Sequence, residues 1–293
     1  MKNCYLHDNG WTVMMNDDFD FATASQEDIN EIACLLATNT LVVARNQQHL
    51  TPQDESRIAH MFGEVENFNA VANVAPISSL IVPNASNEVL RVTGELDEHG
   101  EPGLFGHVED LDWHCNRPAD PNRKPLVWLF AVCHTEGSRT SWNNTILAYD
   151  DLTPELYNTI KDLKMVCGWK KDSYSSFDFG RVQGGITEDF NEHYTPSVIH
   201  TNNGRKTGLF FPFLQFRNFV GMTPEESIAI LEPLKDHILQ EKYIYHHDWR
   251  DGDVIIAEQW LGIHKRWRFE GMDKRILHRV TFDFANSDIS SIA

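Results

Sequence analysis

Two histidines are the residues best placed to do metal chemistry. His114 lies in the segment 111–118, which reads LDWHCNRP, and His264 follows the apolar run Val254–Ala257 and a short connection. Neutral imidazole is the commonest metal ligand in proteins. A single histidine is nevertheless more often a hydrogen-bonded polar residue, and this chain has 14 of them. Each candidate therefore needs support from its surroundings.

A group of basic residues follows His264 in the sequence. It consists of Lys265, Arg266, Arg268, Lys274, Arg275 and Arg279. The chain as a whole is acidic, with 43 Asp and Glu against 25 Lys and Arg and a formal charge of −18. A surface this negative repels phosphate backbones, which makes nucleic acid an unsuitable partner. We therefore expect the basic group to bind a small anion at the site.

The elements that must position these residues include four helices with clear start signals. Three begin with a Thr that can cap and a Pro that suits the first helical position, and the fourth with a capping-box pair. The Thr-Pro pairs are at residues 51–52, 153–154 and 223–224, and the capping-box pair is Ser25 with Asp28 ahead of Ile29–Leu36.

Segments rich in branched and aromatic residues predict β-strands between these helices. They are Thr40–Ala44, Leu80–Val82, Pro125–Cys133, Val254–Ala257 and Arg275–Phe284. Because strands outnumber helices and do not alternate regularly with them, the chain is predicted to be mainly β with helical decoration, a sandwich or jelly roll. We expect residues 1–293 to form one domain, with a long loop or lid over residues 172–193.

No run approaches the length of about 18 apolar residues that a membrane helix needs. The start of the chain also lacks the layout of a signal peptide, so we expect a cytoplasmic protein without a membrane partner. The five cysteines include no CxxC pair, which argues against a disulfide scaffold and a structural zinc site. A homo-oligomer remains open.

Several motifs, in this order and spacing, resemble the taurine dioxygenase-like family of iron(II)- and 2-oxoglutarate-dependent oxygenases over nearly the whole chain. They are Leu41–Gln47, Leu50-Thr51-Pro52, Met61-Phe62-Gly63-Glu64, Trp113-His114, Gly137–Trp142, Trp249-Arg250-x-Gly252-Asp253, His264 and Arg275–Arg279. Each motif is weak by itself, and their order makes the resemblance specific. It implies a double-stranded β-helix, a jelly roll that holds Fe(II) on a His-x-Asp…His triad.

The resemblance also assigns roles to individual residues. His114 and His264 match the two histidine ligands, and Arg275 matches the arginine that grips the distal carboxylate of 2-oxoglutarate, where a planar guanidinium fits a planar carboxylate. Thr140 matches the hydroxyl that assists this arginine. Arg279 lies four residues further on, on the same strand face, and is expected to point toward co-substrate or substrate.

One departure from the family pattern concerns the metal. The chain has Asn116 where the family has its carboxylate ligand, and a neutral amide oxygen is a poorer donor. Asn116 could ligate weakly, it could leave a position for water or halide, as in related halogenases, or another acid could replace it. The candidate acids are Glu109, Asp110, Asp112 and Glu258. A fourth hypothesis is that the protein is catalytically weak or inactive and serves as a jelly-roll binding protein.

Two segments that precede His114 in the sequence give information about the substrate. Val65-Glu66-Asn67-Phe68 stands where sulfonate-binding relatives carry a histidine pair, which argues against taurine. Asp110 lies at the position that faces substrate in the family, and with its acidic neighbours it would favour an amine or amino acid. Trp113 is a further candidate for the substrate wall.

The resemblance implies that 2-oxoglutarate and O2 are co-substrates and that a C–H bond of a small molecule is oxidised. Hydroxylation is the commonest outcome, and desaturation or halogenation would use the same chemistry. A rival reading is a zinc hydrolase with His114 and His264 as ligands and Glu258 as base. That reading leaves Arg275 and Thr140 unexplained.

Overall fold

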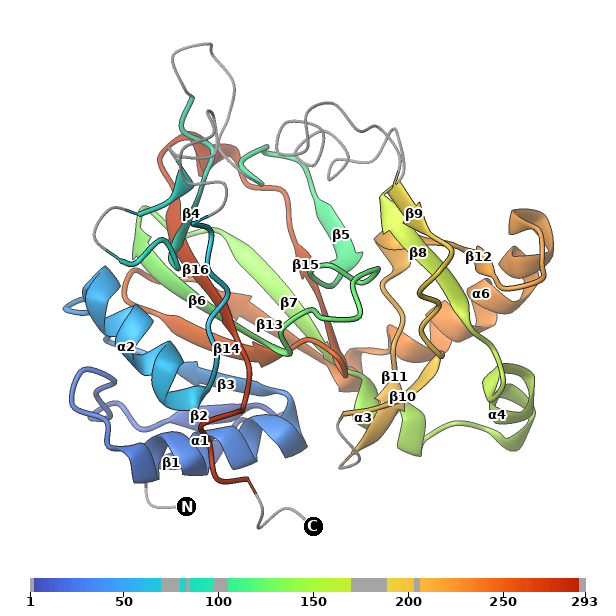
Figure 1. Cartoon of the computed structure of the whole chain (residues 1–293), viewed down its shortest axis with the longest axis horizontal. Coiled ribbons are helices and arrows are strands. Elements are labelled where there is room, and N and C mark those ends of the chain that lie inside the picture. The colour runs from blue at the N-terminus through green and yellow to red at the C-terminus, as the bar shows by residue number, and fades with distance from the viewer. Residues whose placement is uncertain are drawn as a thin grey trace.

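The computed structural model describes residues 3–69, 80–82, 85–96, 105–169, 189–202 and 206–289. Two β-sheets face each other in the middle of the molecule, and helices cover the outer face of the larger sheet (Figure 1). A smaller three-stranded sheet with its own helices lies beside them. The prediction of a mainly β jelly roll with helical decoration is confirmed.

The larger sheet has seven strands in the order β1-β2-β3-β14-β6-β16-β4, and only the β2–β3 pair is parallel. These strands are β1 (Cys4–Leu6), β2 (Val13–Met15), β3 (Leu41–Ala44), β14 (Val254–Glu258), β6 (Leu126–Cys133), β16 (Ile276–Phe282) and β4 (Leu90–Thr93). The central strand β14 is fully buried, as expected for a strand covered on both faces.

The second sheet has four antiparallel strands in the order β13-β7-β15-β5. They are β13 (Ile244–Asp248), β7 (Arg139–Asn144), β15 (Gly262–Arg266) and β5 (Leu111–His114). One buried cluster joins the two sheets, because Trp142 and Tyr245 of this sheet pack with Val127 and Leu277 of the larger one. The two inner faces thus form a sandwich whose open part can hold a site.

Helices α1 (Gln26–Asn39) and α2 (Pro52–Phe62) cover the outer face of the larger sheet. Ser25 and Thr51 cap them, each with the predicted capping box. Fully buried Glu55 of α2 receives hydrogen bonds from His278 and Trp128, which ties the helix to strands β16 and β6.

The smaller sheet has the order β12-β8-β9 and packs with α6. The elements of this part and the remaining short elements are α3 (Thr145–Asp150), α4 (Pro154–Ile160), β8 (Met165–Trp169), β9 (Asp189–Asn191), β10 (Ile199–Thr201), β11 (Thr207–Leu209), η2 (Phe213–Gln215), β12 (Phe216–Phe219), α6 (Pro224–Ile238), η3 (Glu241–Tyr243) and η4 (Glu270–Asp273). Thr153 and Thr223 cap α4 and α6 as predicted.

Most predicted strands correspond to observed ones. The exception is Leu80–Val82, where Ile81 makes only an isolated bridge to Leu90. Of the predicted lid, residues 172–188 lie outside the described residues, and residues 189–191 form β9, paired with β8. The prediction of a single domain and the prediction of a lid both stay predictions.

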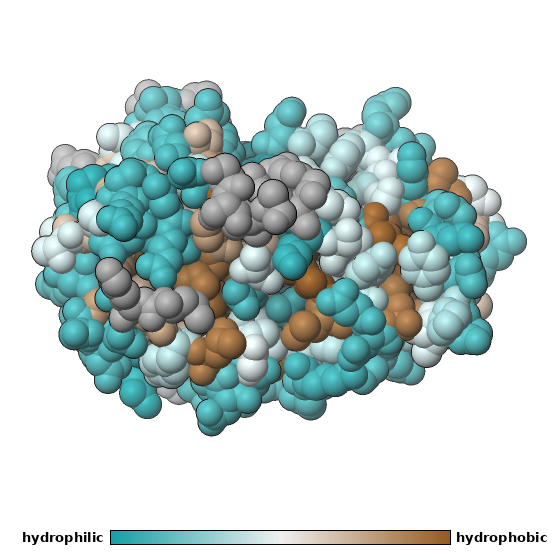
Figure 2. Space-filling view, turned by 90° about the horizontal axis from the view of Figure 1, so that it is seen from below, coloured by the Kyte–Doolittle hydropathy of each residue, from teal (hydrophilic) through white to brown (hydrophobic). Residues whose placement is uncertain are grey.

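Hydrophilic side chains cover most of the face shown in Figure 2, and hydrophobic ones form separate small patches. This agrees with the large excess of acidic residues. None of the helices in the described part of the chain is long and apolar enough to cross a membrane. Homo-oligomer formation stays a prediction.

Candidate active site

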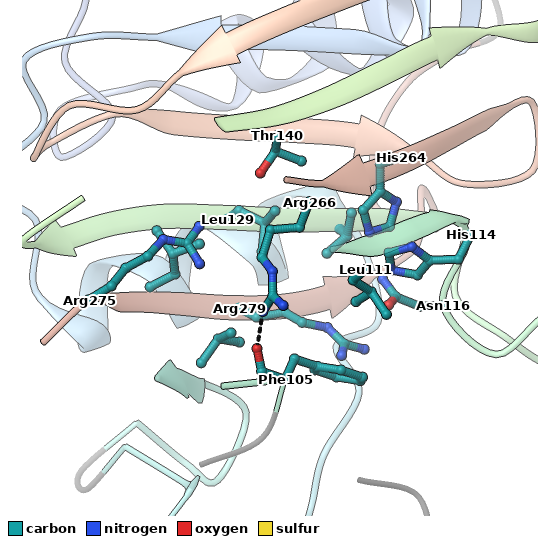
Figure 3. A pocket seen from close by; sticks show the side chains of 13 residues that line it. Phe105, Leu111, His114, Asn116, Leu129, Thr140, His264, Arg266, Arg275 and Arg279 are labelled. Carbon is teal, nitrogen blue, oxygen red and sulfur yellow. Dashed lines mark hydrogen bonds between the residues drawn. The ribbon is translucent and has the colours of Figure 1, made fainter. Parts of the chain in front are cut away.

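A pocket of about 530 Å³, a volume that includes open space at its mouth, lies between the two facing sheets. Strands β5, β7 and β15 of the four-stranded sheet supply polar side chains, and strands β4, β6 and β16 of the seven-stranded sheet close the other side (Figure 3). The lining residues are Val92, Phe105, Leu111, His114, Asn116, Val127, Leu129, Thr140, His264, Arg266, Arg275, Leu277 and Arg279. Every predicted metal and co-substrate residue is among them.

His114 and His264 lie side by side at one end of this pocket. They are direct partners in the antiparallel pairing of β5 and β15, and their ring centroids are 4.1 Å apart. Directly opposed side chains in a sheet lie on the same face, so both rings enter the pocket together. Trp142 of β7 stacks on His264 at 6.3 Å between centroids and supports the ring from the other side.

The histidine rings are also in a state that can bind a metal. The Nδ1 atom of His114 lies 2.7 Å from the backbone carbonyl of Asp112, to which it donates, and this leaves the Nε2 lone pair available. Burial lowers the pKa of His114 to about 4. Burial and the neighbouring His114 ring lower the pKa of His264 as well. Both imidazoles are therefore neutral, the form that ligates.

Arg275 and Thr140 face the same pocket from opposite sheets. Arg275 precedes β16 and is 1% exposed, so little water competes for an anion that its guanidinium binds. The hydroxyl oxygen of Thr140 accepts a hydrogen bond of 2.9 Å from the Trp249 indole N–H, so the hydroxyl hydrogen can be donated elsewhere. A cation and a hydroxyl donor on one buried cavity suit a carboxylate ligand.

Two further arginines line the pocket and differ in what holds them. Arg266 donates to the backbone carbonyls of Phe105, His107 and Glu109, which fixes the segment in front of β5. Arg279 has no comparable hydrogen bonds to backbone carbonyls within the described parts of the chain, and its Nε atom is buried without a hydrogen-bond partner there. Arg279 thus has unused hydrogen-bonding capacity toward the cavity, whereas the bonds of Arg266 hold the wall.

Asn116 also lines the pocket, next to His114 (Figure 3). Its side-chain Nδ2 donates to the Gln259 Oε1 atom at 2.5 Å, and its backbone N–H donates to the same oxygen at 3.2 Å. Gln259 lies between β14 and β15 and is 2% exposed. Sequence reasoning missed Gln259, for which the only available signal was its position next to Glu258.

The four acids proposed to replace the missing carboxylate all bind elsewhere. Glu109 pairs with Arg268, Asp110 and Asp112 with Lys265, and the Glu258 carboxylate accepts the backbone N–H groups of residues 260 and 261. No group of three His, Cys, Asp or Glu side chains that could hold a metal exists within the described ranges. Replacement by another acid, and Glu258 as the base of a zinc hydrolase, are therefore not supported.

The two substrate candidates from the segment before His114 also lie outside the pocket lining. The Asp110 carboxylate accepts the backbone N–H of Arg268 at 2.6 Å as well as pairing with Lys265. Trp113 packs into the buried cluster that includes Cys115, Phe211 and Ile263. Because adjacent strand residues point to opposite faces, Trp113 must point away from the cavity that His114 enters.

The buried carboxyl of Glu258 should make the stability of the protein depend on pH. Burial raises the pKa of its carboxyl to about 7 from an ordinary value of 4.5, so the folded chain holds a proton that the unfolded chain has lost in this range. Stability should therefore fall as pH rises from about 4.5 to 7, by about 3 kcal/mol, and stay level above it.

Urea unfolding of the wild type and of Glu258→Gln across this pH range measures the effect. The variant carries a constant offset, because an amide cannot accept both backbone N–H groups, but it should lack this part of the pH dependence. If the free energy of unfolding depends on pH in the same way for both proteins, Glu258 is already ionised at pH 5.

A family model described as taurine catabolism dioxygenase TauD, TfdA family matches residues 9–281. The chain belongs to the TauD/TfdA family. Enzymes of this family use Fe(II) with 2-oxoglutarate and O2, and the chain is accordingly a 2-oxoglutarate-dependent dioxygenase by family. The predicted recognition, enzyme class and cofactors are confirmed at this level.

Individual TauD/TfdA proteins resemble the chain at low identity. An (S)-phenoxypropionate/alpha-ketoglutarate-dioxygenase of Sphingobium herbicidovorans is 26% identical over 78% of this chain and 77% of its own length. The pentalenolactone F synthase of Streptomyces arenae is 22% identical over 87% of this chain and 86% of its own. The solved structure of AAD-2 in complex with Mn(II) and N-oxalylglycine has a TM-score of 0.75 at 18% identity and covers 95% of this chain and 96% of that one.

Proposed function

We propose that this enzyme oxidises an unactivated C–H bond of a small carboxylic acid, with hydroxylation as the outcome. The observation that carries the proposal is one pocket shared by the paired histidines, Arg275 with Thr140, and Arg279. These groups match the needs of three bound partners: a ferrous ion, a dicarboxylate and an anionic substrate. Fe(II) and 2-oxoglutarate supply the oxidising chemistry, in which O2 is consumed and 2-oxoglutarate becomes succinate and CO2.

The residues of the chain serve binding and orientation in this scheme. His114, His264 and the Asn116 amide would hold the metal, and Arg275 and Thr140 would hold the distal carboxylate of 2-oxoglutarate. The apolar side chains of Val92, Leu129 and Leu277 lie in the same lining and exclude water from the reacting groups. The protein determines which C–H bond reacts through where it holds the substrate.

The charge of the pocket favours an acidic substrate. Its described lining contains Arg266, Arg275 and Arg279 and no Asp or Glu. The amine preference inferred from Asp110 loses its support, since that carboxylate pairs with Lys265. An amino acid still satisfies the pocket through its own carboxylate. The compound in the name of the Sphingobium relative, (S)-phenoxypropionate, is likewise a carboxylate with an apolar body.

Anaerobic titration of the purified protein with Fe(II) and then 2-oxoglutarate tests the proposal directly. Chelation of iron by the keto acid produces a weak visible metal-to-ligand absorption, which should saturate with 2-oxoglutarate and be missing without the metal. Failure to form this band would remove the proposed function. A band without succinate formation after O2 is admitted would instead support the alternative that Asn116 leaves a binding protein with little or no turnover.

Arg279→Leu should weaken the binding of an acidic substrate by about 10-fold to 100-fold, because it removes a charged hydrogen-bond donor from a buried cavity. The probe is (S)-2-phenoxypropionate, measured by calorimetry in the presence of metal and N-oxalylglycine, with its primary amide as the control ligand. Binding of the amide should change little. If the affinity for N-oxalylglycine falls instead, Arg279 belongs to the co-substrate side.

A further inference from the structure

Asn116 and Gln259 form a pair whose orientation can be deduced from the backbone. The Asn116 backbone N–H can only donate, and the Gln259 atom that it contacts at 3.2 Å must therefore be the amide oxygen, Oε1. The Asn116 side-chain atom that lies 2.5 Å from the same oxygen must then be the nitrogen, Nδ2. This leaves Oδ1 as the Asn116 atom turned away from Gln259.

The orientation matters because only one side-chain end of an asparagine can ligate a metal. The oxygen of an amide offers lone pairs, whereas its NH2 group offers hydrogens and no free pair. An aspartate at the same position has two equivalent oxygens, and either one can ligate after a rotation of the side chain. The amide at position 116 thus requires an orienting partner that a carboxylate would not require.

We propose that Gln259 is a positioning residue that holds the Asn116 amide with Oδ1 available to the metal. This inference rests on the proposed function, since it takes Asn116 as the third protein ligand beside His114 and His264. Metal binding would then require a buried hydrogen-bond acceptor at position 259 in addition to the three ligands. This acceptor would compensate in part for the replacement of a carboxylate by an amide. Partners that orient metal ligands commonly act in this way.

The connection that carries Gln259 is built to hold it still. The Gln259 backbone N–H donates to the Pro125 carbonyl at 2.8 Å, and the Glu258 carboxylate accepts two backbone N–H groups of the same turn. Gly262 closes the turn so tightly that an added Cβ would lie 2.5 Å from the Glu258 carbonyl oxygen. These contacts leave little backbone freedom to Gln259, as a positioning group requires.

A double-mutant cycle on metal affinity separates orientation from general support. Four proteins are compared: the wild type, Gln259→Leu, Asn116→Asp and the double variant. For each, Mn(II) binding in the presence of saturating N-oxalylglycine is measured by the decrease of the electron paramagnetic resonance signal of free Mn(II). We expect Gln259→Leu to weaken Mn(II) binding about 10-fold or more in the wild-type background, but by less than about 3-fold in the Asn116→Asp background. Gln259→Glu, which keeps an acceptor, should restore most of the loss when Asn116 is unchanged.

Gln215→Leu is the matched control. Gln215 is a fully buried glutamine that accepts the Cys115 backbone N–H at 3.1 Å and donates to the Cys115 carbonyl at 2.7 Å, and it contacts the residue next to Asn116 without bonding the Asn116 side chain. Any effect of Gln215→Leu on Mn(II) affinity should be the same in the wild-type and Asn116→Asp backgrounds, because it acts only on the backbone.

Each other outcome overturns a defined part of the inference. An equal loss for Gln259→Leu in both backgrounds would make Gln259 a general support of the fold, and no loss in either would remove it from the site. If only the proteins with aspartate at position 116 bind Mn(II), the natural amide is not a ligand. The assignment of the pocket as the 2-oxoglutarate site would be unaffected by that result. If none of the proteins binds Mn(II) with N-oxalylglycine, the proposed function itself fails.

Discussion

Replacement of Arg275 by alanine should raise the 2-oxoglutarate concentration needed for half-saturation by about 100-fold. The guanidinium is 1% exposed, so a carboxylate that it binds is removed from water together with it. Removing one partner of such a buried charge pair costs about 3 kcal/mol, which corresponds to this factor. Titration of the visible metal-to-ligand absorption with 2-oxoglutarate under anaerobic conditions measures it.

Two further variants make the Arg275 result specific. Arg275→Lys keeps the charge without the two-pronged donor geometry and should recover only part of the affinity. Arg139→Ala removes a surface arginine that pairs with Asp248 and should leave the titration unchanged. An unaltered 2-oxoglutarate requirement in Arg275→Ala would place the co-substrate outside this pocket.

His264→Ala should lower metal affinity by more than about 100-fold, since it removes one of the two imidazole ligands and the amide of Asn116 is a weak third donor. The neutral ring contributes a nitrogen lone pair that the described pocket lining cannot replace, because His114 is the only other His, Cys, Asp or Glu side chain in it. Mn(II) titration in the presence of N-oxalylglycine is the measurement, and thermal unfolding checks the fold.

His200→Ala is the control for His264→Ala. His200 is another histidine whose pKa burial lowers to about 4, but it packs on Trp260 and Phe210 and does not line the pocket. Its replacement should leave metal affinity within about 2-fold of the wild type while it lowers stability. Equal metal affinity in His264→Ala and His200→Ala would end the assignment of His264 as a ligand.

The helices show which parts of the fold local sequence can predict. The capping boxes of Ser25, Thr51 and Thr223 involve residues only three positions apart, and all three begin helices in the structure. The interactions that fix such a start lie within one turn, so the same residues favour it in the unfolded chain. Helix α3 (Thr145–Asp150), which Asn144 caps without an acidic partner, lacked such a signal.

Strand β16 shows that alternation carries information about a site. Leu277 and Arg279 line the pocket, while His278 and Val280 face the helices on the outer side, as the period of two predicts. The same rule applied to β5 would have excluded Trp113, because its neighbour His114 faces the pocket. The family resemblance pointed at the metal and co-substrate residues and did not describe what surrounds them.

Local pattern and motif order were thus enough to define helix starts, strand faces, the jelly roll and the polar residues that share the pocket. Only the folded chain decided that Asp110 pairs with Lys265, that no nearby described acid replaces the missing carboxylate, and that Gln259 reaches Asn116 across 143 positions of sequence. The physical reason is range. Caps and alternation depend on neighbours a few residues apart, whereas the partner of a buried polar group is chosen by the packing of distant strands, where an unpaired donor or acceptor is costly.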